Sequence, residues 1–504
     1  MRDRSGRLRA VGAATLSVAL AVACQAAVSP APSPSTAPSG STASIPPLPS
    51  SSAQPTPGLT PSAPTSQLAG HWEATGATNV YRQDGRLLAL TSGGALLIGT
   101  GEGSDGFAAP TSVEVWDPGT GDWTEGPDLN RLRFDFAAVA LSDDRVLVAG
   151  GLNGDSPAQS YSSAYIFDAR SGSGSWSKTA LMVAARSAPA AARLSDGRVL
   201  VAGGYFHLEP EEGSAANADL AGFVAPGLFD IDNGPAGAAF ATAEVFDPTS
   251  GTWTATGSMV YARSGAEAVT LSDGRVLVVG STDRAGNSPY HVTVHDDAFV
   301  TAEIYDPASG RFTLTGRLPA IDRAALEEQA PANANPMPED DGQPMGVGSL
   351  VALPDGGAVL IGNTRWWKHQ ADMTRSFRFD ARSGAWSEIG KPYVYVFGPG
   401  PVVVLTPGVR DVARSVAAVL ADGRVLVAGG SGLSPNGFGT EPTDVAEVYD
   451  PATNSWTTVA DMPDARSGGT SALLADGSVL LVGGLLDRGD EGQTPLTTAA
   501  QFVP

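Results

Sequence analysis

Cysteine is almost absent from this chain of 504 residues, in which Cys24 is the only one. A single cysteine cannot form a disulfide within the chain, so an exported form would depend on its packing for stability. Lysine is also scarce, because the chain has only Lys178, Lys368 and Lys391. With 31 basic residues against 53 acidic ones, the net charge is −22. A chain this acidic is unsuited to bind nucleic acid, and the sequence predicts no nucleic-acid partner.

The N-terminal apolar segment is too short to cross a bilayer. Four arginines within the first nine residues precede the stretch VGAATLSVALAVA, which ends just before Cys24. A basic start followed by a short apolar run is typical of a secretory signal peptide rather than of a spanning helix. The sequence therefore predicts a signal peptide over residues 1–23 and an extracytoplasmic location.

Cys24 occupies the position at which a bacterial lipoprotein is cleaved and acylated. The preceding residues read AVAC, which resembles a bacterial lipobox, although Ala21 stands where leucine is more usual. A stray free thiol is the alternative interpretation. Lipidation would attach the protein to the cell membrane through a lipid anchor and without a spanning segment. Without it, the protein would be secreted.

Residues 24–68 form a segment of Pro, Ser, Thr and Ala. Between Gln25 and Gln67 it contains no charged residue. Such a composition cannot bury a core, so we expect an extended, disordered tether. The tether would hold the remainder of the chain away from the membrane.

From residue 69 onward, a unit of about fifty residues occurs seven times. Its clearest copies read LSDGRVLVAGG at 194–204 and AEVFDPTSGTW at 243–253. A repeat of this period predicts the blades of a β-propeller. The dipeptide DG is a hairpin signal, VLVAGG is typical of a short buried strand, and the DPxSG sequence indicates another turn. The turn position is occupied by Ser92, Asp143, Asp196, Asp273, Asp355, Asp422 and Asp476.

The seventh copy ends the chain at Pro504 and lacks the closing tryptophan of the others. Trp72, in the segment GHWEATG before the first repeat, can supply it. The last blade would then take its outer strand from the start of the domain, and this closure would remove free sheet edges. The predicted fold is all-β, with seven four-stranded blades over residues 69–504 and an N-terminal strand that completes the last blade.

These repeats resemble the kelch repeat, specifically its bacterial form with DGRVLVAGG and YDPxTxxW. The resemblance covers nearly all of the chain after residue 68 and rests on seven Gly positions in register. It implies a bacterial kelch β-propeller of the secreted or lipoprotein type. The repeated glycines, aromatics and tryptophans are explained by blade packing, so none of them marks an active site.

The connections within the repeats predict two unlike faces. Strands a to d of a blade alternate in direction, so the a–b and c–d turns share one face and the b–c and d–a loops share the other. From strand-c to strand-d aromatic the step is 7 residues in five blades. The b–c step is 17 residues in three blades but 43 in the third and 25 in the fourth. Because function concentrates where loops vary, the site is predicted on this loop-rich face.

Five blades carry an arginine ten residues before the turn position, where we expect it to open the innermost strand beside a central channel. These residues are Arg82, Arg133, Arg186, Arg263 and Arg466. Three of them are followed by a serine, namely Ser187, Ser264 and Ser467. The other two blades have Met345 and Val412 at this position and have expanded d–a loops.

The resemblance gives these arginines a candidate role. Eukaryotic kelch adaptors that capture acidic peptides bind carboxylates with Arg and Ser at the matching position, which implies a cationic funnel here. The alternative is structural: each arginine would pair with neighbouring loop carbonyls or with a carboxylate.

Two inserts on the loop-rich face contain further candidates. In the fourth blade, His291, His295 and Asp296 could hold a divalent metal, or could form a solvated strand and turn. In the fifth blade, Trp366 and Trp367 suit stacking on sugars or partner side chains, or could pack beneath neighbouring loops.

The sequence favours a surface binding module that recognises an anionic peptide, a glycan or a partner protein. No cofactor is predicted, because kelch copper oxidases need a cysteine joined to a tyrosine ligand and the repeats contain no cysteine. The alternative is a carbohydrate-active enzyme similar to kelch sialic-acid mutarotases, for which the sequence supplies no catalytic residue. A third possibility is a rigid spacer. A basic funnel would favour binding, and a buried carboxylate would favour catalysis.

Overall fold

The computed structural model describes most of the repeat region, which belongs to one compact unit, Pro64–Pro504. The described residues are 70–80, 85–99, 112–129, 133–153, 160–170, 173–206, 238–280, 301–319, 345–346, 348–367, 371–390, 393–394, 415–433, 440–487 and 493–504. The predicted signal peptide, Cys24 and the tether lie outside them. Within these ranges, no helix is long and apolar enough to cross a membrane.

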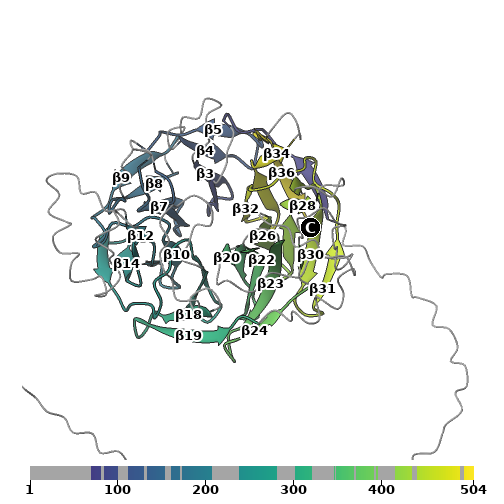
Figure 1. The fold of residues 1–504 in the computed structure, drawn as a ribbon. Helices are drawn as coiled ribbons and strands as arrows, with labels where there is room; N and C mark the ends of the chain where they lie inside the picture. The colour runs from purple at the N-terminus through teal and green to yellow at the C-terminus, as the bar shows by residue number, and fades with distance from the viewer. Residues whose placement is uncertain are drawn as a thin grey trace, which may run out of the picture. The chain divides into compact units, whose positions relative to one another are not determined.

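Seven antiparallel sheets are arranged around a ring (Figure 1), and they correspond to the seven predicted blades. The first three consist of β2 (Arg86–Ala89), β3 (Ala95–Gly99), β4 (Ser112–Trp116) and β5 (Trp123–Glu125); β6 (Ala137–Ala140), β7 (Arg145–Ala149), β8 (Ala164–Asp168) and β9 (Ser175–Lys178); and β10 (Ala190–Arg193), β11 (Val199–Ala202), β14 (Ala243–Asp247) and β15 (Thr252–Ala255). The fourth and sixth consist of β16 (Glu267–Thr270), β17 (Val276–Val279), β18 (Thr301–Asp306) and β19 (Arg311–Arg317); and β26 (Val416–Val419), β27 (Val425–Ala428), β30 (Ala446–Asp450) and β31 (Ser455–Thr458).

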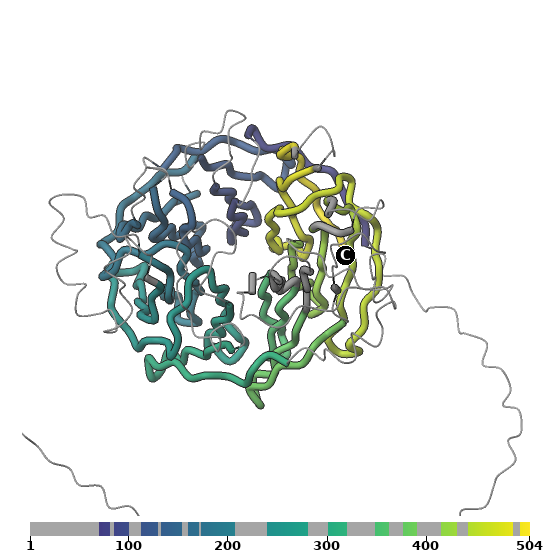
Figure 2. The backbone as a smooth tube through the Cα atoms, in the orientation of Figure 1, coloured from purple at the N-terminus to yellow at the C-terminus, as the bar shows by residue number. Residues whose placement is uncertain are grey.

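The seventh blade closes the ring as predicted. Its strands are β32 (Thr470–Leu473), β33 (Val479–Val482), β36 (Ala499–Val503) and, from the start of the domain, β1 (His71–Ala74). Trp72 pairs with Phe502 in register, and its Nε1 donates to the Ala460 carbonyl at 2.8 Å. Figure 2 shows the purple N-terminal strand beside the yellow C-terminal ones.

The core is made of contacts between adjacent blades. Apart from Arg145 at the start of β7, the side chains of strand b that the structure describes are apolar and buried, as in Val199–Ala202, because neighbouring sheets cover both faces of the strand. In six blades the aromatic of strand c packs on the aromatic of strand d, with ring centroids 4.8 to 5.2 Å apart. The prediction that the repeated aromatics serve packing is confirmed for these pairs.

The fifth blade departs from the predicted four strands. It contains β21 (Ser349–Ala352), β22 (Ala358–Trp367), β23 (Ala371–Asp380) and β24 (Ala385–Glu388), and also the two-residue strands β20 (Met345–Gly346) and β25 (Tyr393–Val394). Four other blades end strand b at a Gly-Gly pair with positive φ, for example Gly203 and Gly204. The fifth has Asn363 in place of the second glycine, and β22 continues past it with a register shift between Leu360 and Asn363.

The b–c connections of three blades end in short ribbons on the loop-rich face. These ribbons are β12 (Tyr205–Phe206) with β13 (Ala238–Ala239), β28 (Ser431–Leu433) with β29 (Thr440–Pro442), and β34 (Leu485–Asp487) with β35 (Gln493–Pro495). In each case two residues separate the end of strand b from the start of the ribbon. The described parts of these three connections therefore lie on the face where the sequence predicted the variable loops, while the longest inserts lie outside the described residues.

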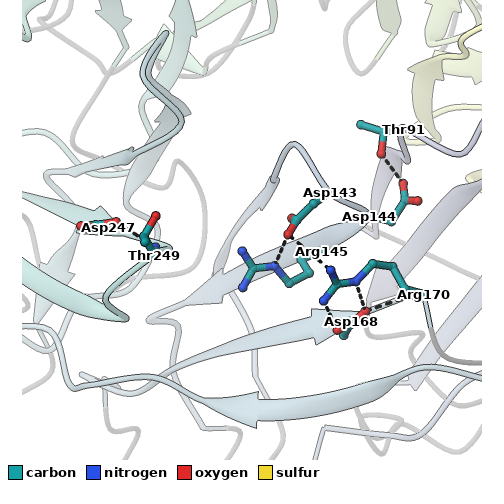
Figure 3. A network of polar contacts seen from close by, with 8 residues as sticks. All are labelled: Thr91, Asp143, Asp144, Arg145, Asp168, Arg170, Asp247 and Thr249. Atoms are coloured by element: carbon teal, nitrogen blue, oxygen red, sulfur yellow. Dashed lines mark hydrogen bonds and ion pairs between the residues drawn. The ribbon is translucent and has the colours of Figure 1, made fainter.

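The opposite face is formed by tight turns that carry Asp–Arg pairs (Figure 3). Arg145 and Arg170 lie beside Asp143 and Asp168, with closest N–O distances of 2.7 and 2.6 Å. Asp144 has φ +57°, at the position that glycine occupies in the other turns. Its carboxylate accepts hydrogen bonds from the Thr91 hydroxyl at 2.6 Å and the Ser92 backbone N–H at 2.9 Å. This side chain therefore ties the second blade to the turn of the first.

Asp144 should make the stability of the domain depend on pH. Burial raises its pKa, but the hydrogen bonds from Thr91 and Ser92 outweigh that effect and leave the pKa below its usual value. A lowered folded-state pKa stabilises the fold above the unfolded pKa of about 3.9, and the benefit is lost as the pH falls through the folded value. We expect Asp144→Asn, which tolerates positive φ, to lower the urea midpoint at pH 7 more than at pH 3. An equal loss at both pH values would contradict this interpretation.

Candidate functional site

Four of the five predicted arginines are described, and each lies in the d–a loop four residues before its strand a. They are Arg133, Arg186, Arg263 and Arg466, ahead of β6, β10, β16 and β32. The expectation that these arginines open the innermost strand is therefore wrong, because a short loop segment separates each of them from that strand. All four are almost completely buried. Arg82, the fifth, lies outside the described residues.

Each guanidinium joins the end of strand b to the start of strand c in its own blade. The Nη1 of Arg186 donates to the carbonyl oxygens of Gly203 at 2.6 Å and Thr242 at 3.0 Å. Its Nη2 donates to the Thr242 hydroxyl at 3.3 Å and to Glu244 at 2.8 Å. The same pairing with a glycine carbonyl and with a Ser or Thr recurs for Arg133 with Gly150 and Ser163, Arg263 with Gly280 and Thr301, and Arg466 with Gly483 and Thr498.

A glutamate of strand c completes this arrangement in two blades. Glu303 pairs with Arg263 at 3.2 Å, and both side chains are fully buried. The Glu303 carboxylate also binds the d–a loop, where it accepts hydrogen bonds from the backbone N–H groups of Val260 at 2.6 Å and Tyr261 at 3.2 Å. Glu244 binds Arg186 and the N–H groups of Val183 and Ala184 in the same way.

Burial sets the electrostatics of these arginines. It lowers the pKa of Arg186 and of Arg263, and the charges of Glu244 and Glu303 oppose that shift. Burial also lowers the pKa of Arg466, to about 10, against the opposing charge of Asp464 at 3.4 Å. In the second blade, tyrosine replaces the glutamate, and the Arg133 guanidinium lies 4.4 Å from the ring centroid of Tyr161 and 5.1 Å from that of Tyr165. Each buried cation is thus matched by a carboxylate or by aromatic rings.

The backbones of Arg186, Arg263 and Arg466 extend the connection to the preceding blade. The Gly151 N–H donates to the Arg186 carbonyl at 2.9 Å, and the Gly204 N–H donates to the Arg263 carbonyl at 2.7 Å. A Cβ on Gly203 would lie 2.3 Å from the Arg263 carbonyl oxygen, so the position requires glycine. We call the four buried arginines, together with the Gly-Gly pairs that bind their backbones, the arginine belt. It connects the second, third and fourth blades, and it connects the sixth blade with the seventh.

The structural alternative for the arginines is thereby confirmed at the four described positions, since they bind loop carbonyls and carboxylates. Ligand binding by the arginines stays a prediction, and a ligand would have to displace these internal contacts. Ser187, Ser264 and Ser467 are also buried. The backbones of Ser187 and Ser467 form bridges with Tyr205 and Leu485 at the base of two ribbons.

One sequence signal for the arginine belt was missed. The residue four positions before the strand-c aromatic is Ser or Thr in all five blades that carry the arginine: Ser112, Ser163, Thr242, Thr301 and Thr498. In the two blades that have Met345 and Val412 instead, it is Arg375 and Val445. Because the guanidinium binds this hydroxyl, the two positions change together between blades. Comparing the repeats with one another would have identified the pair.

The other candidates are less fully described. The side chains of Trp366 and Trp367 are not described, although their backbone lies at the end of β22, opposite Asp372 and Ala371. His291, His295 and Asp296 lie outside the described residues. Among the residues that are described, no group of three or more His, Cys, Asp or Glu could hold a metal ion.

Comparisons with known proteins agree with this architecture. The family model for the Kelch motif matches residues 413–463. A solved structure described as a novel fungal alcohol oxidase of the AA5 family, in complex with copper, is similar to 86% of this chain and 76% of its own, with 18% identity and a TM-score of 0.53. The structure of YjhT covers 74% of this chain and 95% of its own, with 14% identity and a TM-score of 0.43. No curated protein sequence matches the chain.

The similarity to the oxidase structure bears on the fold alone, since an identity of 18% does not carry activity from one protein to another. The Kelch motif match, the seven sheets around a ring and the closure of the last blade by β1 point the same way. The chain is a kelch-repeat β-propeller protein.

Proposed function

We propose that this protein is a binding module whose loop-rich face contacts a partner protein or peptide. Kelch propellers include both binding modules and enzymes, so the fold by itself does not choose between them. The observation that carries the proposal is that apolar side chains are exposed on d–a loops whose backbone is bound by the buried glutamates Glu244 and Glu303. Val183 and Val260 are 46% and 56% exposed, in the d–a loops of adjacent blades.

These two valines are held by the glutamates of the arginine belt. The Val183 N–H donates to Glu244 and the Val260 N–H donates to Glu303, both at 2.6 Å. Leu181, in the same loop as Val183, is also exposed. Exposed apolar side chains on ordered loops lose little entropy on binding, which favours contact with a protein surface. In this proposal the buried arginines shape the face, and the partner contacts the loops above them.

The proposal predicts that charge on these loops abolishes binding without loss of stability. We expect the double change Val183→Glu with Val260→Glu to reduce binding to any peptide or protein partner at least tenfold, at an unchanged melting temperature. Leu314→Glu is the matched control, because Leu314 is 44% exposed but belongs to the outer strand β19. Peptide and glycan arrays followed by titration would measure the effect. Binding that survives the double change, or binding to glycans only, would contradict the proposal.

The second part of the proposal concerns attachment to the membrane. Cys24 would carry a lipid, and residues 24–68 would separate the propeller from the bilayer. A Cys24→Ser chain should then move from the membrane fraction to the medium and fail to incorporate labelled fatty acid. Retention of that variant at the membrane would exclude the anchor while leaving the binding proposal intact.

A further inference from the structure

The exposed charges on the loop-rich face differ in sign from the buried ones. In the d–a and b–c loops, the arginines whose side chains the structure describes are the four of the arginine belt, and all four are buried. The described charged side chains of these loops that reach solvent are aspartates: Asp128, Asp135, Asp444, Asp461 and Asp464. The described loops are therefore negative where a partner would touch them, although they are built on arginines.

The strand ends that border these loops do not change the sign. Three glutamates there are exposed or partly exposed, and so are three cations. The glutamates are Glu125, Glu267 and Glu388, and the cations are Arg86, Lys178 and Arg317. Because these six charges balance, the aspartates of the loops decide the charge of the described part of this face.

Two of these aspartates adjoin the d–a loop of residues 179–189, which carries the exposed Leu181 and Val183. At the inner end of this loop, the Asp135 carbonyl oxygen accepts the Ala188 N–H at 2.6 Å. At its outer end, the carbonyl oxygen of Pro127, the residue before Asp128, accepts the Nε1 hydrogen of Trp176 at 2.7 Å. Trp176 belongs to β9, the strand from which the loop starts. Carboxylates thus flank both ends of a loop that exposes aliphatic side chains.

Asp135 keeps its side chain at a backbone position that favours glycine. Its φ is +52°, and the equivalent residues of the fourth and seventh blades are Gly265 and Gly468, with φ of +63° and +70°. An aspartate adopts this left-handed region at a cost that glycine does not have. Its carboxylate accepts the Tyr205 hydroxyl at 3.2 Å and remains partly exposed. A carboxylate is thus kept on this face at a conformational cost, which a role in binding would explain.

We propose that the partner of the loop-rich face is a cationic protein segment in which lysine or arginine residues alternate with aliphatic ones. The inference rests on the binding function proposed above and names the chemistry of the partner. The aliphatic side chains of the segment pack on Leu181, Val183 and Val260. Its cations pair with Asp128 and Asp135. An acidic segment would meet carboxylates of like charge, and it could reach the buried arginines only by displacing their internal partners.

The test is a fluorescence-polarisation titration of the full-length chain with four labelled synthetic peptides of equal length. Three of them alternate valine with lysine, glutamate or serine, and the fourth alternates lysine with serine. We expect saturable binding of the lysine–valine peptide, at least tenfold tighter than that of the other three, because it alone offers both kinds of contact. Its Kd should rise with ionic strength, since salt screens exposed charges.

Asp135→Gly separates binding from stability. Because glycine favours the positive φ of this position, the variant should melt at the native temperature or above it. It should nevertheless bind the lysine–valine peptide at least threefold more weakly, since one carboxylate is lost. Asp122→Asn is the matched control, because Asp122 is an exposed aspartate in a c–d turn on the opposite face, and it should leave binding unchanged.

The double change Val183→Ser with Val260→Ser distinguishes failure of this inference from failure of the proposed function, because it removes the apolar contacts without changing the charge. A serine–valine or glutamate–valine peptide that binds as tightly as the lysine–valine peptide, and is lost in this variant, would keep the binding face and overturn the cationic partner. The inference is also overturned if the lysine–valine peptide does not bind, or if Asp135→Gly binds it as tightly as the native chain. Binding of this peptide that survives the double change would contradict both proposals.

Discussion

Arg263→Ala is expected to destabilise the propeller by about 3 to 5 kcal/mol, because it leaves Glu303 charged and fully buried without its partner. The change also removes the donor that binds the carbonyl oxygens of Gly280 and Thr301. The measurement is the free energy of unfolding from urea titration, followed by the fluorescence of the tryptophans. Arg186→Ala should behave similarly, since Arg186 makes the same set of contacts with Glu244.

Arg198→Ala is the matched control for the buried arginines. Arg198 pairs with Asp196 at 2.7 Å on the turn face, where both side chains are exposed. Exposed ion pairs contribute about 0 to 1 kcal/mol, so this variant should unfold close to the native midpoint. If Arg263→Ala unfolded like the control and instead lost an acidic ligand, the arginine would be a ligand-binding residue and the structural interpretation would be wrong.

Removal of β1 should have the second large effect, because it reopens the ring. A chain that begins at residue 76 loses four residue pairs with β36 and the packing of Trp72 on Phe502, whose ring centroids lie 5.2 Å apart. The outer edge of β36 would then present unpaired backbone groups, which promote edge-to-edge association. We expect this shortened chain to elute mainly as aggregate in gel filtration and to lose its cooperative unfolding transition.

A chain that begins at Pro64 provides the comparison, since it keeps β1 and should remain monomeric and cooperative. The single change Trp72→Ala tests the side chain alone and should cost about 2 to 4 kcal/mol, because it removes an aromatic contact and the bond to the Ala460 carbonyl. A monomeric, cooperative chain from residue 76 would show that the six complete blades hold the ring without closure by the N-terminal strand.

The sequence was sufficient to predict the blades and their closure because the signals were local and repeated. The DG turns, the apolar strand b and the paired aromatics each specify a short segment, and seven copies in register remove the ambiguity of any one. Trp72 could be assigned to the last blade because the seventh copy ends without its tryptophan. The exception was the fifth blade, in which Asn363 replaces a glycine. Its strand b continues past this position to Trp367, and no other repeat predicts this extension.

The candidate site could be predicted only in part. The position of the arginines was evident from the alignment of repeats, but the direction of their side chains was not, because a guanidinium can reach solvent or the interior from the same loop. The burial of Arg186 depends on three distant partners, Gly203, Thr242 and Glu244, which the insert between strands b and c separates widely in the sequence.

The arginine belt also explains how a loop in this protein can grow without cost to the ring. Arg186 donates hydrogen bonds to both ends of the longest b–c connection, at Gly203 and Thr242. Arg133 makes the same contacts at the ends of a much shorter connection, at Gly150 and Ser163. The chain between two such fixed points can change in length at a small entropic penalty, because loop closure depends only logarithmically on length. We therefore expect foreign segments to be tolerated better at these connections than in the sixth blade, where Val412 stands in place of the arginine. The blades that carry a buried arginine are the natural positions for grafting new recognition loops.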